Sequence, residues 1–348
     1  MLGTVRIGGG APVSVQSMTN TDTRDVAATL VQIRELAGAG CDIIRVAVPD
    51  PASAAAVKEI VAGSPLPVIA DIHFDYRLAV AAMESGAHGI RINPGNIGEE
   101  WKLKEVVSVA VERGVPIRVG VNGGSLEEEL LKQYGGATPE ALVESALRSC
   151  ARVEEAGCHA IKVSLKSSSV PDTVKAYRLF AARTDYPLHL GVTEAGTLLG
   201  GTVKSAAGIG ALLLDGIGDT LRVSLTGPCV DEVNVGIRIL EAVGLREAHP
   251  EIVSCPTCGR TKIGLVPIVT AVENEVARLK KAGKTIRLRK IAIMGCVVNG
   301  PGEARDADLG IAGGIGKGVL FKNGKIERTL PEAELLPALL EEIRAAAG

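Results

Sequence analysis

Hydrophobic and polar residues repeat in one pattern along the first two-thirds of the chain. Each repeat ends a helical pattern, places a glycine where a helix C-cap would lie, and continues with a short β-rich run. The pattern is clear in ELAGAGCDIIRVAV, MESGAHGIRINP, VERGVPIRVGVN and VEEAGCHAIKVSLK. The runs VSVQSM, PVIADIH, YPLHLGVTE and TLRVSLT follow the same rhythm and bring the predicted strands to eight.

Helical patterns separate these strands, and they include residues 24–38, 77–85, 99–113, 138–156 and 171–183. Strands that alternate with helices run parallel, because each helix returns the chain to the end of the sheet where it started. Eight such units within residues 1–245 predict an α/β fold, a closed (β/α)8 barrel of the TIM type. An open, doubly wound sheet is the alternative. We expect the opening stretch TVRIGGGAPVSV to form a small hairpin over the lower end of the barrel.

The pattern changes after residue 245, where LREAHPEIVS is typical of a linker. Residues 250–348 then predict a strand with a Cys-x-x-Cys turn, a helix near 267–281 and three strands at KIAIMG, DLGIAG and GVLFKNG. A last helix near 332–346 closes the chain. These elements predict a second, smaller α+β domain.

Polar residues share one face of the predicted barrel strands, since residues two apart point to the same side. The opposite face is almost entirely apolar and must meet the helices, so the polar face points into the barrel. A purely structural interior would hold Val, Ile and Leu there. The predicted inward cations are Arg45, Arg91, Arg118, Lys162 or Lys166, and Arg222, and their polar neighbours include Asp71, His73, Asn93, Asn122, Ser164 and Ser224.

Buried cations destabilise a protein unless they are paired. Internal carboxylates such as Asp71, Asp215 or Glu194 would match only some of the inward cations. Guanidinium groups suit phosphate oxygens because their fork of donors binds two oxygens at once. The surplus of positive charge therefore predicts a phosphate or diphosphate ligand at the mouth of the barrel, and structural ion pairing is the alternative.

Three cysteines distinguish the second domain: Cys255 and Cys258 in SCPTCGR, and Cys296 in MGCVVNGPGE. A zinc ribbon would need a second Cys-x-x-Cys or a histidine pair, and a redox pair would leave Cys296 unexplained. An iron–sulfur cluster normally takes four thiolates, so here its fourth position would be open or held by oxygen. Glu303 could fold back as that ligand, or it could be a solvated loop acid.

Composition narrows the class of protein further. The formal net charge is −2 over 348 residues, which argues against a nucleic-acid-binding protein. No apolar run is long enough to span a membrane, and the opening residues lack the layout of a signal peptide. The other four of the seven cysteines (Cys41, Cys150, Cys158 and Cys229) are scattered singly, so we expect packing roles for them and a reducing, cytoplasmic setting.

Eight motifs resemble one family over essentially the whole chain: VQSMTNTDTRD, RINPGN, GVNGGSLE, VSLKSS, GVTEAG, RVSLTG, SCPTCGR and IMGCVVNGPGEARDADLG. The family is that of the bacterial 4-hydroxy-3-methylbut-2-enyl diphosphate synthases (IspG/GcpE) of the methylerythritol phosphate route to isoprenoids. The last motif is highly specific. The chain resembles the compact bacterial form, without the extra domain of the plant enzymes.

The resemblance implies a [4Fe-4S] cluster on Cys255, Cys258 and Cys296, with Glu303 as the fourth ligand. It implies that the barrel binds 2-C-methyl-D-erythritol 2,4-cyclodiphosphate and that Glu194 acts as the acid/base. The implied anion-binding residues are Arg45, Arg91, Arg118, Lys166 and Arg222, helped by Asn93, Asn122 and Ser224, with Asp71 and His73 near the carbons of the substrate.

The resemblance also implies two kinds of protein partner. Reduced ferredoxin or flavodoxin would supply electrons, and a second copy of the chain would complete a homodimer in which one barrel faces the other chain's cluster domain. A barrel that binds a pterin or phosphosugar, followed by a structural zinc domain, is the alternative enzyme. An electron carrier or iron sensor docked on a scaffold barrel is a third interpretation, against which the charged interior argues.

Overall fold

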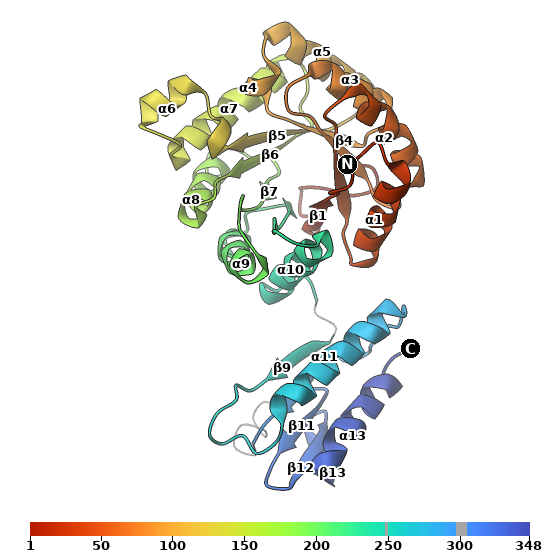
Figure 1. Cartoon of the computed structure of the whole chain (residues 1–348). Coiled ribbons are helices and arrows are strands. Elements are labelled where there is room, and N and C mark those ends of the chain that lie inside the picture. The colour runs from red at the N-terminus through yellow and green to blue at the C-terminus, as the bar shows by residue number, and fades with distance from the viewer. Residues whose placement is uncertain (248–249, 297–304) are drawn as a thin grey trace. The chain divides into compact units, whose positions relative to one another are not determined.

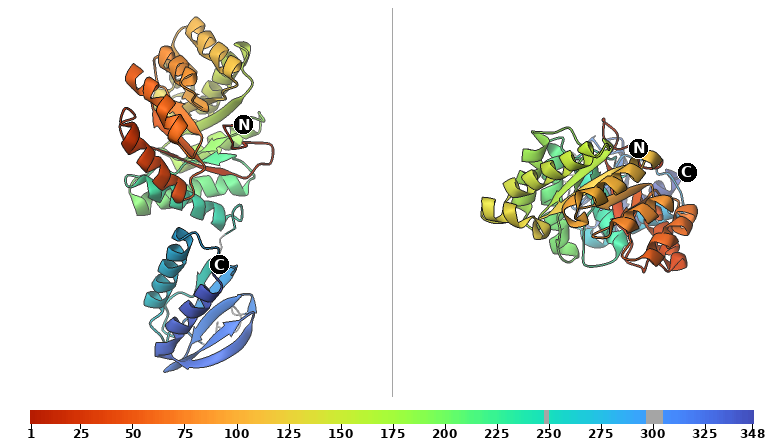
Figure 2. Two further views of the ribbon diagram at one scale, coloured as in Figure 1. Left: turned by 90° about the vertical axis from the view of Figure 1, so that its right-hand side faces the viewer. Right: turned by 90° about the horizontal axis from the view of Figure 1, so that it is seen from above.

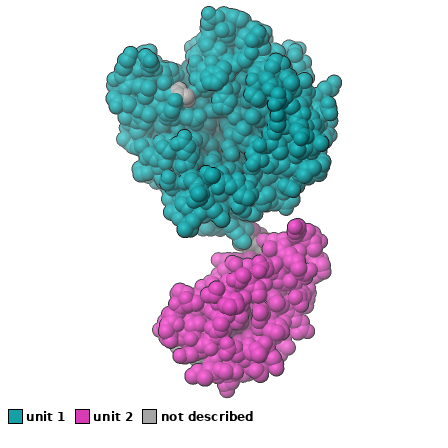
Figure 3. Space-filling view, viewed as in Figure 1, with its two compact units in different colours: residues 1–246 teal, residues 247–348 magenta. Residues whose placement is uncertain are grey.

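The computed structural model describes residues 1–247, 250–296 and 305–348. The chain divides into two compact units, Met1–Arg246 and Glu247–Gly348, which Figure 3 shows in teal and magenta. Each unit has its own hydrophobic core. Within the described residues, no helix combines the length and the apolar character that a membrane span requires.

The first unit alternates strands with helices, and the helices lie outside the strands (Figure 1). The strands are β1 (Ser14–Met18), β2 (Ile43–Ala47), β3 (Val68–Asp71), β4 (Gly89–Ile92), β5 (Ile117–Asn122), β6 (Ile161–Lys166), β7 (His189–Leu190) and β8 (Thr220–Leu221). The helices are α1 (Val26–Gly38), α2 (Pro51–Gly63), α3 (Tyr76–Glu84), α4 (Pro94–Ile97), α5 (Glu100–Arg113), α6 (Glu128–Tyr134), α7 (Pro139–Glu155), α8 (Val170–Ala181), α9 (Leu198–Leu214) and α10 (Cys229–Ala242), with a 3-10 turn at Gly123–Ser125.

All eight strands run parallel in the order β6-β5-β4-β3-β2-β1-β8-β7. A parallel bridge between Val163 and Leu188 joins the two ends of this order, so the sheet closes. Tyr177 of α8 supports the closure, because its hydroxyl donates to the carbonyl of His189 and accepts from the N–H of Leu165. The predicted TIM-type barrel is confirmed.

The barrel strands divide their residues as the alternation predicts. On β5, Ile117, Val119 and Val121 are fully buried in the core between strands and helices. Arg118, between them, belongs to the opposite face and lies inside the barrel. The strands β7 and β8 are shorter than their apolar runs suggest, so Thr193 and Arg222 follow the strands rather than belonging to them.

The opening residues cover the end of the barrel where the strands begin. The hairpin predicted over residues 4–15 does not form; the segment instead has one bridge, in which the backbone groups of Leu2 and Val5 pair at 2.8 and 3.0 Å. Leu2 is buried against Ile43 and Ile69 at the strand starts. Gly89 leaves space for it, since a Cβ at that position would collide with the Leu2 side chain.

The second unit is a mixed sheet with two helices on one face. Its elements are β9 (Glu251–Ser254), α11 (Leu265–Lys281), β10 (Lys290–Met294), β11 (Leu309–Gly313), β12 (Lys317–Lys322), β13 (Lys325–Pro331) and α13 (Glu332–Ala345). The sheet order is β13-β12-β11-β10-β9, with β9, β10 and β11 parallel and the last two pairings antiparallel. The helices α11 and α13 lie side by side (Figure 2). The sequence pattern missed β13, the exposed second strand of a hairpin.

Candidate functional site

A cavity of about 240 Å3 lies inside the barrel at the end where the strands finish. In a parallel barrel this end carries the loops and the polar strand termini that build active sites. The cavity brings together nine of the ten residues predicted for substrate binding. Its lining residues are Arg45, Asp71, His73, Arg91, Arg118, Asn122, Ser164, Lys166, Thr193, Arg222 and Ser224.

Asp71 is the only carboxylate among these lining residues and it organises three of them. Its oxygens lie 3.6 Å from Arg45 Nε, 3.3 Å from Arg91 Nη1 and 3.6 Å from His73 Nε2. Burial by itself would raise the pKa of Asp71, but Arg45, the hydrogen bond with His73 and Arg91 together hold it well below its usual range. Asp71 therefore stays ionised and keeps both guanidinium groups aimed into the cavity.

Glu232 holds the guanidinium group of Arg222 as Asp71 holds those of Arg45 and Arg91, and the sequence analysis did not predict it. It lies in the first turn of α10, is 3 % exposed, and accepts from Arg222 Nε and Nη2 at 3.3 Å. The backbone N–H of Leu225 also donates to it at 3.0 Å. Met18 is a second missed neighbour, with its sulfur 3.2 Å from Arg45 Nε. No spacing or repeat in the sequence links Glu232 to Arg222 or Met18 to Arg45.

Positive charge remains in surplus after these pairings. Within the part of the chain that the structure describes, Arg118 and Lys166 form no ion pair, and they are 3 % and 7 % exposed. Burial, followed by repulsion from Arg118 and Arg45, lowers the pKa of Lys166 well below its usual value. Burial likewise lowers the pKa of Arg45 to about 10. A polyanion in the cavity would relieve this repulsion.

Two interior glycines make room for the cations. A Cβ on Gly120 of β5 would lie 2.6 Å from Arg91 Nε, and one on Gly191 would lie 2.7 Å from Lys166 Nζ. Both distances are far shorter than a van der Waals contact. Because Gly120 and Gly191 have no side chain, the ends of Arg91 and Lys166 can occupy the space beside them.

The structure separates the two lysines of β6 and removes two of the three expected internal acids, Asp215 and the exposed Glu194. Lys166 lines the cavity at the strand ends, whereas Lys162 lines a different cavity near the strand starts. Asp215 is not internal, and that expectation is wrong. It follows α9 on the outside of the barrel, where its Oδ2 lies 2.7 Å from Arg178 Nε.

Two predicted residues do not line the cavity. Asn93 is buried at the start of α4, where its Oδ1 accepts from the N–H of Gly95 at 3.1 Å. Glu194 follows Thr193, which does line the cavity, but its own side chain is exposed. Its φ of +53° is rare for a residue with a side chain. The roles predicted for both residues stay predictions.

The three cysteines of the second unit lie near one edge of its sheet. Cys255 follows β9 and Cys296 follows the neighbouring parallel strand β10, so both stand where these strands end. The N–H of Gly295 donates to Cys255 Sγ at 3.1 Å. Hydrogen bonds from the Arg260 backbone and side chain lower the pKa of the Cys258 thiol. Thiols whose anions are stabilised in this way suit a metal or an iron–sulfur cluster.

Over residues 1–247, 250–296 and 305–348, however, no three His, Cys, Asp or Glu side chains form a ready-made metal-holding group. Glu303, the predicted fourth ligand, lies outside the described residues. The cluster therefore stays a prediction, supported by the chemistry of the donor set. The remaining cysteines, Cys41, Cys150, Cys158 and Cys229, are all buried, in agreement with packing roles.

Comparison with known families identifies both units. The profile of the GcpE TIM-barrel domain matches residues 1–237, and that of the GcpE protein C-terminal domain matches residues 251–345. The chain belongs to the GcpE family. The family assignment covers the barrel and the cysteine-bearing unit alike, so the two cavities and the sheet edge described above are features of a GcpE protein.

Curated GcpE relatives match nearly the full length of the chain. A protein from Geobacter sulfurreducens, named 4-hydroxy-3-methylbut-2-en-1-yl diphosphate synthase (flavodoxin), is 60 % identical over 98 % of this chain and 95 % of its own. A protein of the same name from Caldanaerobacter subterraneus is 58 % identical over 98 % of this chain and 95 % of its own. Another, from Thermodesulfovibrio yellowstonii, is 54 % identical over 99 % of this chain and 97 % of its own.

Among solved structures, a Yersinia pestis dihydropteroate synthase matches at 15 % identity and a TM-score of 0.48, over 67 % of this chain and 93 % of that one.

Proposed function

We propose that this chain is a 4-hydroxy-3-methylbut-2-en-1-yl diphosphate synthase, the activity that the names of its relatives give. We also propose that reduced flavodoxin supplies its electrons, since those names mention flavodoxin. The observation that carries the proposal is the cavity at the strand ends, where five cations face one lining carboxylate. We further propose that its substrate is 2-C-methyl-D-erythritol 2,4-cyclodiphosphate, whose two phosphates supply the negative charge that the cavity lacks.

The reaction consumes two electrons and two protons. One carbon–oxygen bond to phosphate breaks and opens the ring, and the freed phosphate oxygen takes one proton. A hydroxyl takes the other proton and leaves as water, and the linear allylic diphosphate remains. A [4Fe-4S] cluster held by Cys255, Cys258, Cys296 and Glu303 would supply the electrons one at a time and a Lewis-acidic iron. The donor set supports this assignment, since backbone N–H groups of Gly295 and Arg260 donate to the sulfurs of Cys255 and Cys258.

The barrel residues bind and orient the substrate. Arg45, Arg91, Arg118, Lys166 and Arg222 would hold the phosphate oxygens through charge-assisted hydrogen bonds. Asp71 keeps Arg45 and Arg91 in place, and Glu232 does so for Arg222, so little reorganisation is needed on binding. The pKa of Lys166, which burial lowers in the free protein, should rise again next to the phosphates, because a nearby anion favours the charged amine.

Glu194 would donate the proton with which the hydroxyl leaves. Its strained backbone supports this role, since residues held at positive φ against their preference cluster at functional sites. Replacing Glu194 by Gln should abolish turnover and leave the visible spectrum of the cluster unchanged. Glu155, an exposed residue at the end of α7, provides the matched control as Glu155→Gln. Full activity of Glu194→Gln would remove Glu194 from the mechanism.

The test of the function starts with protein purified without oxygen. We expect iron and acid-labile sulfide in equal amounts, and conversion of the cyclic diphosphate to the linear product with reduced flavodoxin, followed by mass spectrometry. Zinc without sulfide in such a sample would overturn the reductive mechanism and favour the barrel with a structural zinc domain.

We also propose that two chains form a homodimer in which one barrel works with the other chain's cysteine-bearing unit. Co-expression of Arg118→Ala chains with Cys296→Ala chains tests this arrangement. Mixed dimers would combine an intact barrel from one chain with an intact cysteine unit from the other, and activity would return. If the two variants stay inactive together while each still dimerises, the shared site is wrong.

A further inference from the structure

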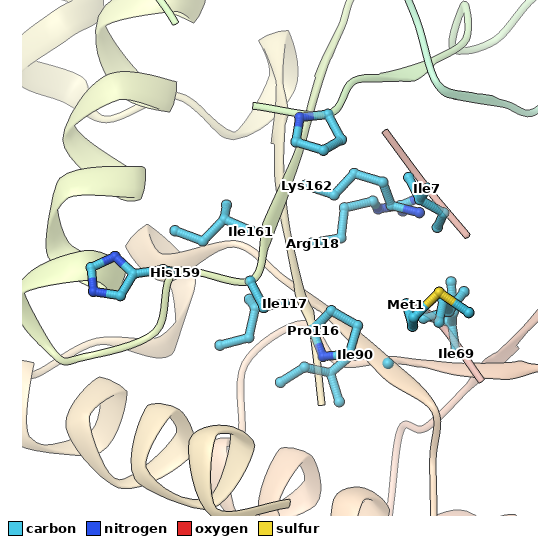
Figure 4. A pocket seen from close by; sticks show the side chains of 14 residues that line it. Met1, Ile7, Ile69, Ile90, Pro116, Ile117, Arg118, His159, Ile161 and Lys162 are labelled. Carbon is cyan, nitrogen blue, oxygen red and sulfur yellow. The ribbon is translucent and has the colours of Figure 1, made fainter. Parts of the chain in front are cut away.

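A second cavity, of about 200 Å3, lies at the other end of the barrel (Figure 4). The first residues of β4, β5 and β6 line it, which places it where the strands begin. Most of its wall is apolar and includes Leu2 and Ile7 of the opening segment. The proposed reaction takes place at the opposite end, so it does not account for this cavity.

Two buried cations enter the apolar cavity. Arg118 and Lys162 face each other as register partners on β5 and β6 and are 3 % and 7 % exposed. Among the described residues, Lys162 Nζ and Arg118 Nε and Nη1 have no hydrogen-bond partner. In Figure 4 the two side chains run side by side and their nitrogen-bearing ends lie near Ile7. None of the described residues that line the cavity is an Asp or a Glu.

The substrate cannot satisfy Lys162. Lys166 lies four residues further along β6, which separates their Cα atoms by about 13 Å along the strand. Only Lys166 lines the cavity at the strand ends. Burial and then Arg118 lower the pKa of Lys162 to about 7, although the nearby carboxylate of Asp219 raises it in part, so the amine holds its proton weakly. A buried amine without a partner destabilises the fold unless something binds it.

We infer that the cavity at the strand starts binds a small carboxylate with a short apolar body, held between Lys162 and Arg118. The carboxylate would accept charge-assisted hydrogen bonds from nitrogens that otherwise have none. The apolar wall would cover the body of the ligand, as in other small-molecule sites. Carboxylate binding at this site does not depend on the proposed function; only its coupling to phosphate, through Arg118, rests on that function.

Arg118 makes the two cavities interdependent, because it lines both. A carboxylate that engages its guanidinium from the strand starts leaves less positive charge for a phosphate at the strand ends. Each anion should therefore weaken the binding of the other. The factor is the same in both directions, because it reflects one coupling free energy between the two sites.

Isothermal titration of the full chain with sodium butyrate, at constant ionic strength set by chloride, tests the site. Wild-type protein and Lys166→Met should bind butyrate alike, whereas Lys162→Met should bind it at least about tenfold more weakly. Saturating butyrate should also weaken the binding of inorganic pyrophosphate to the wild type, and this effect should vanish in Lys162→Met.

Equal butyrate binding by wild type and Lys162→Met would overturn the inference, as would binding that only Lys166→Met abolishes. No butyrate binding by the wild type would also overturn it. Bicarbonate titrated in parallel distinguishes a ligand held by its oxygens alone from one that needs the apolar wall. Ile7→Phe is a second variant, which fills the cavity from the opening segment and keeps both cations, so it should block butyrate even if Lys162→Met folds poorly.

Discussion

At the mouth of the barrel, nine of the ten predicted substrate residues surround one cavity. The three cysteines of the second unit lie near one edge of its sheet, but within the described residues they do not form a metal-holding group. The barrel residues stand on or directly after strands whose register determines their positions. The cysteines stand in the segments that follow two strands. A site on a regular sheet is formed by the fold, while a thiolate site in connecting segments is completed when its metal binds.

The largest expected effect comes from breaking the cysteine site. Cys296→Ser should lose its iron and all measurable turnover, because a hydroxyl is a poor ligand for iron compared with a thiolate. The barrel should be unaffected, so inorganic pyrophosphate should still bind with wild-type affinity in titration calorimetry. Cys158→Ala is the control, since Cys158 is buried in the barrel core, and it should keep both iron and activity.

Removing an unpaired cation from the mouth should have the next largest effect. Arg118→Gln removes charge-assisted hydrogen bonds to phosphate, each of which contributes about 1.5–3 kcal/mol, so we expect kcat/KM to fall by a factor of about 100. Iron content and the spectrum of the cluster should not change. Arg113→Gln, on the exposed end of α5, should match the wild type; an equal loss in both variants would mean that general charge, and not the cavity, drives binding.

Adding one methyl group inside the barrel should give a smaller effect. Gly120→Ala places a Cβ against Arg91 Nε and displaces that guanidinium from Asp71, so we expect KM to rise about tenfold through the loss of one charged contact. Gly124→Ala is the matched control, because a Cβ there would have no atom within 4 Å. Steady-state kinetics that do not separate the two variants would show that Arg91 is not held by this packing.

The smallest expected effect is the uptake of protons by Lys166 when pyrophosphate binds at the mouth of the barrel. Its size shows how far Lys166 is already charged before the anion binds. The free protein holds the pKa of Lys166 well below 10.5, and a bound phosphate should raise it again. At a pH between the lowered pKa and 10.5, pyrophosphate binding should take up less than one proton, measured as the difference in binding enthalpy between two buffers. Below that window Lys166 is already charged and contributes no uptake. Lys166→Met should take up fewer protons than the wild type at the same pH.

Much of the fold and part of the site could be predicted from the sequence. The eight strands, the closed barrel and the inward face that carries Arg91 and Arg118 follow from the alternation of residues, which depends on local geometry. The hairpin strand β13 was missed because its residues are mostly exposed and polar, so they show no buried pattern. The pairing of Glu232 with Arg222 was missed because this ion pair joins the first turn of α10 to the segment after β8, and no spacing or repeat in the sequence marks it.

The order of residues along the chain is enough to predict which side chains face the barrel interior and to assign the family. The folded chain was needed to see that Lys162 and Lys166 line different cavities, that Asp215 lies outside, and that Arg118 borders the cavities at both ends of the barrel. The two kinds of information differ in the distance along the chain over which they act. A strand's period sets the direction of each side chain locally, but the depth of that side chain in the barrel and its partners depend on the register and packing of strands far apart in the chain.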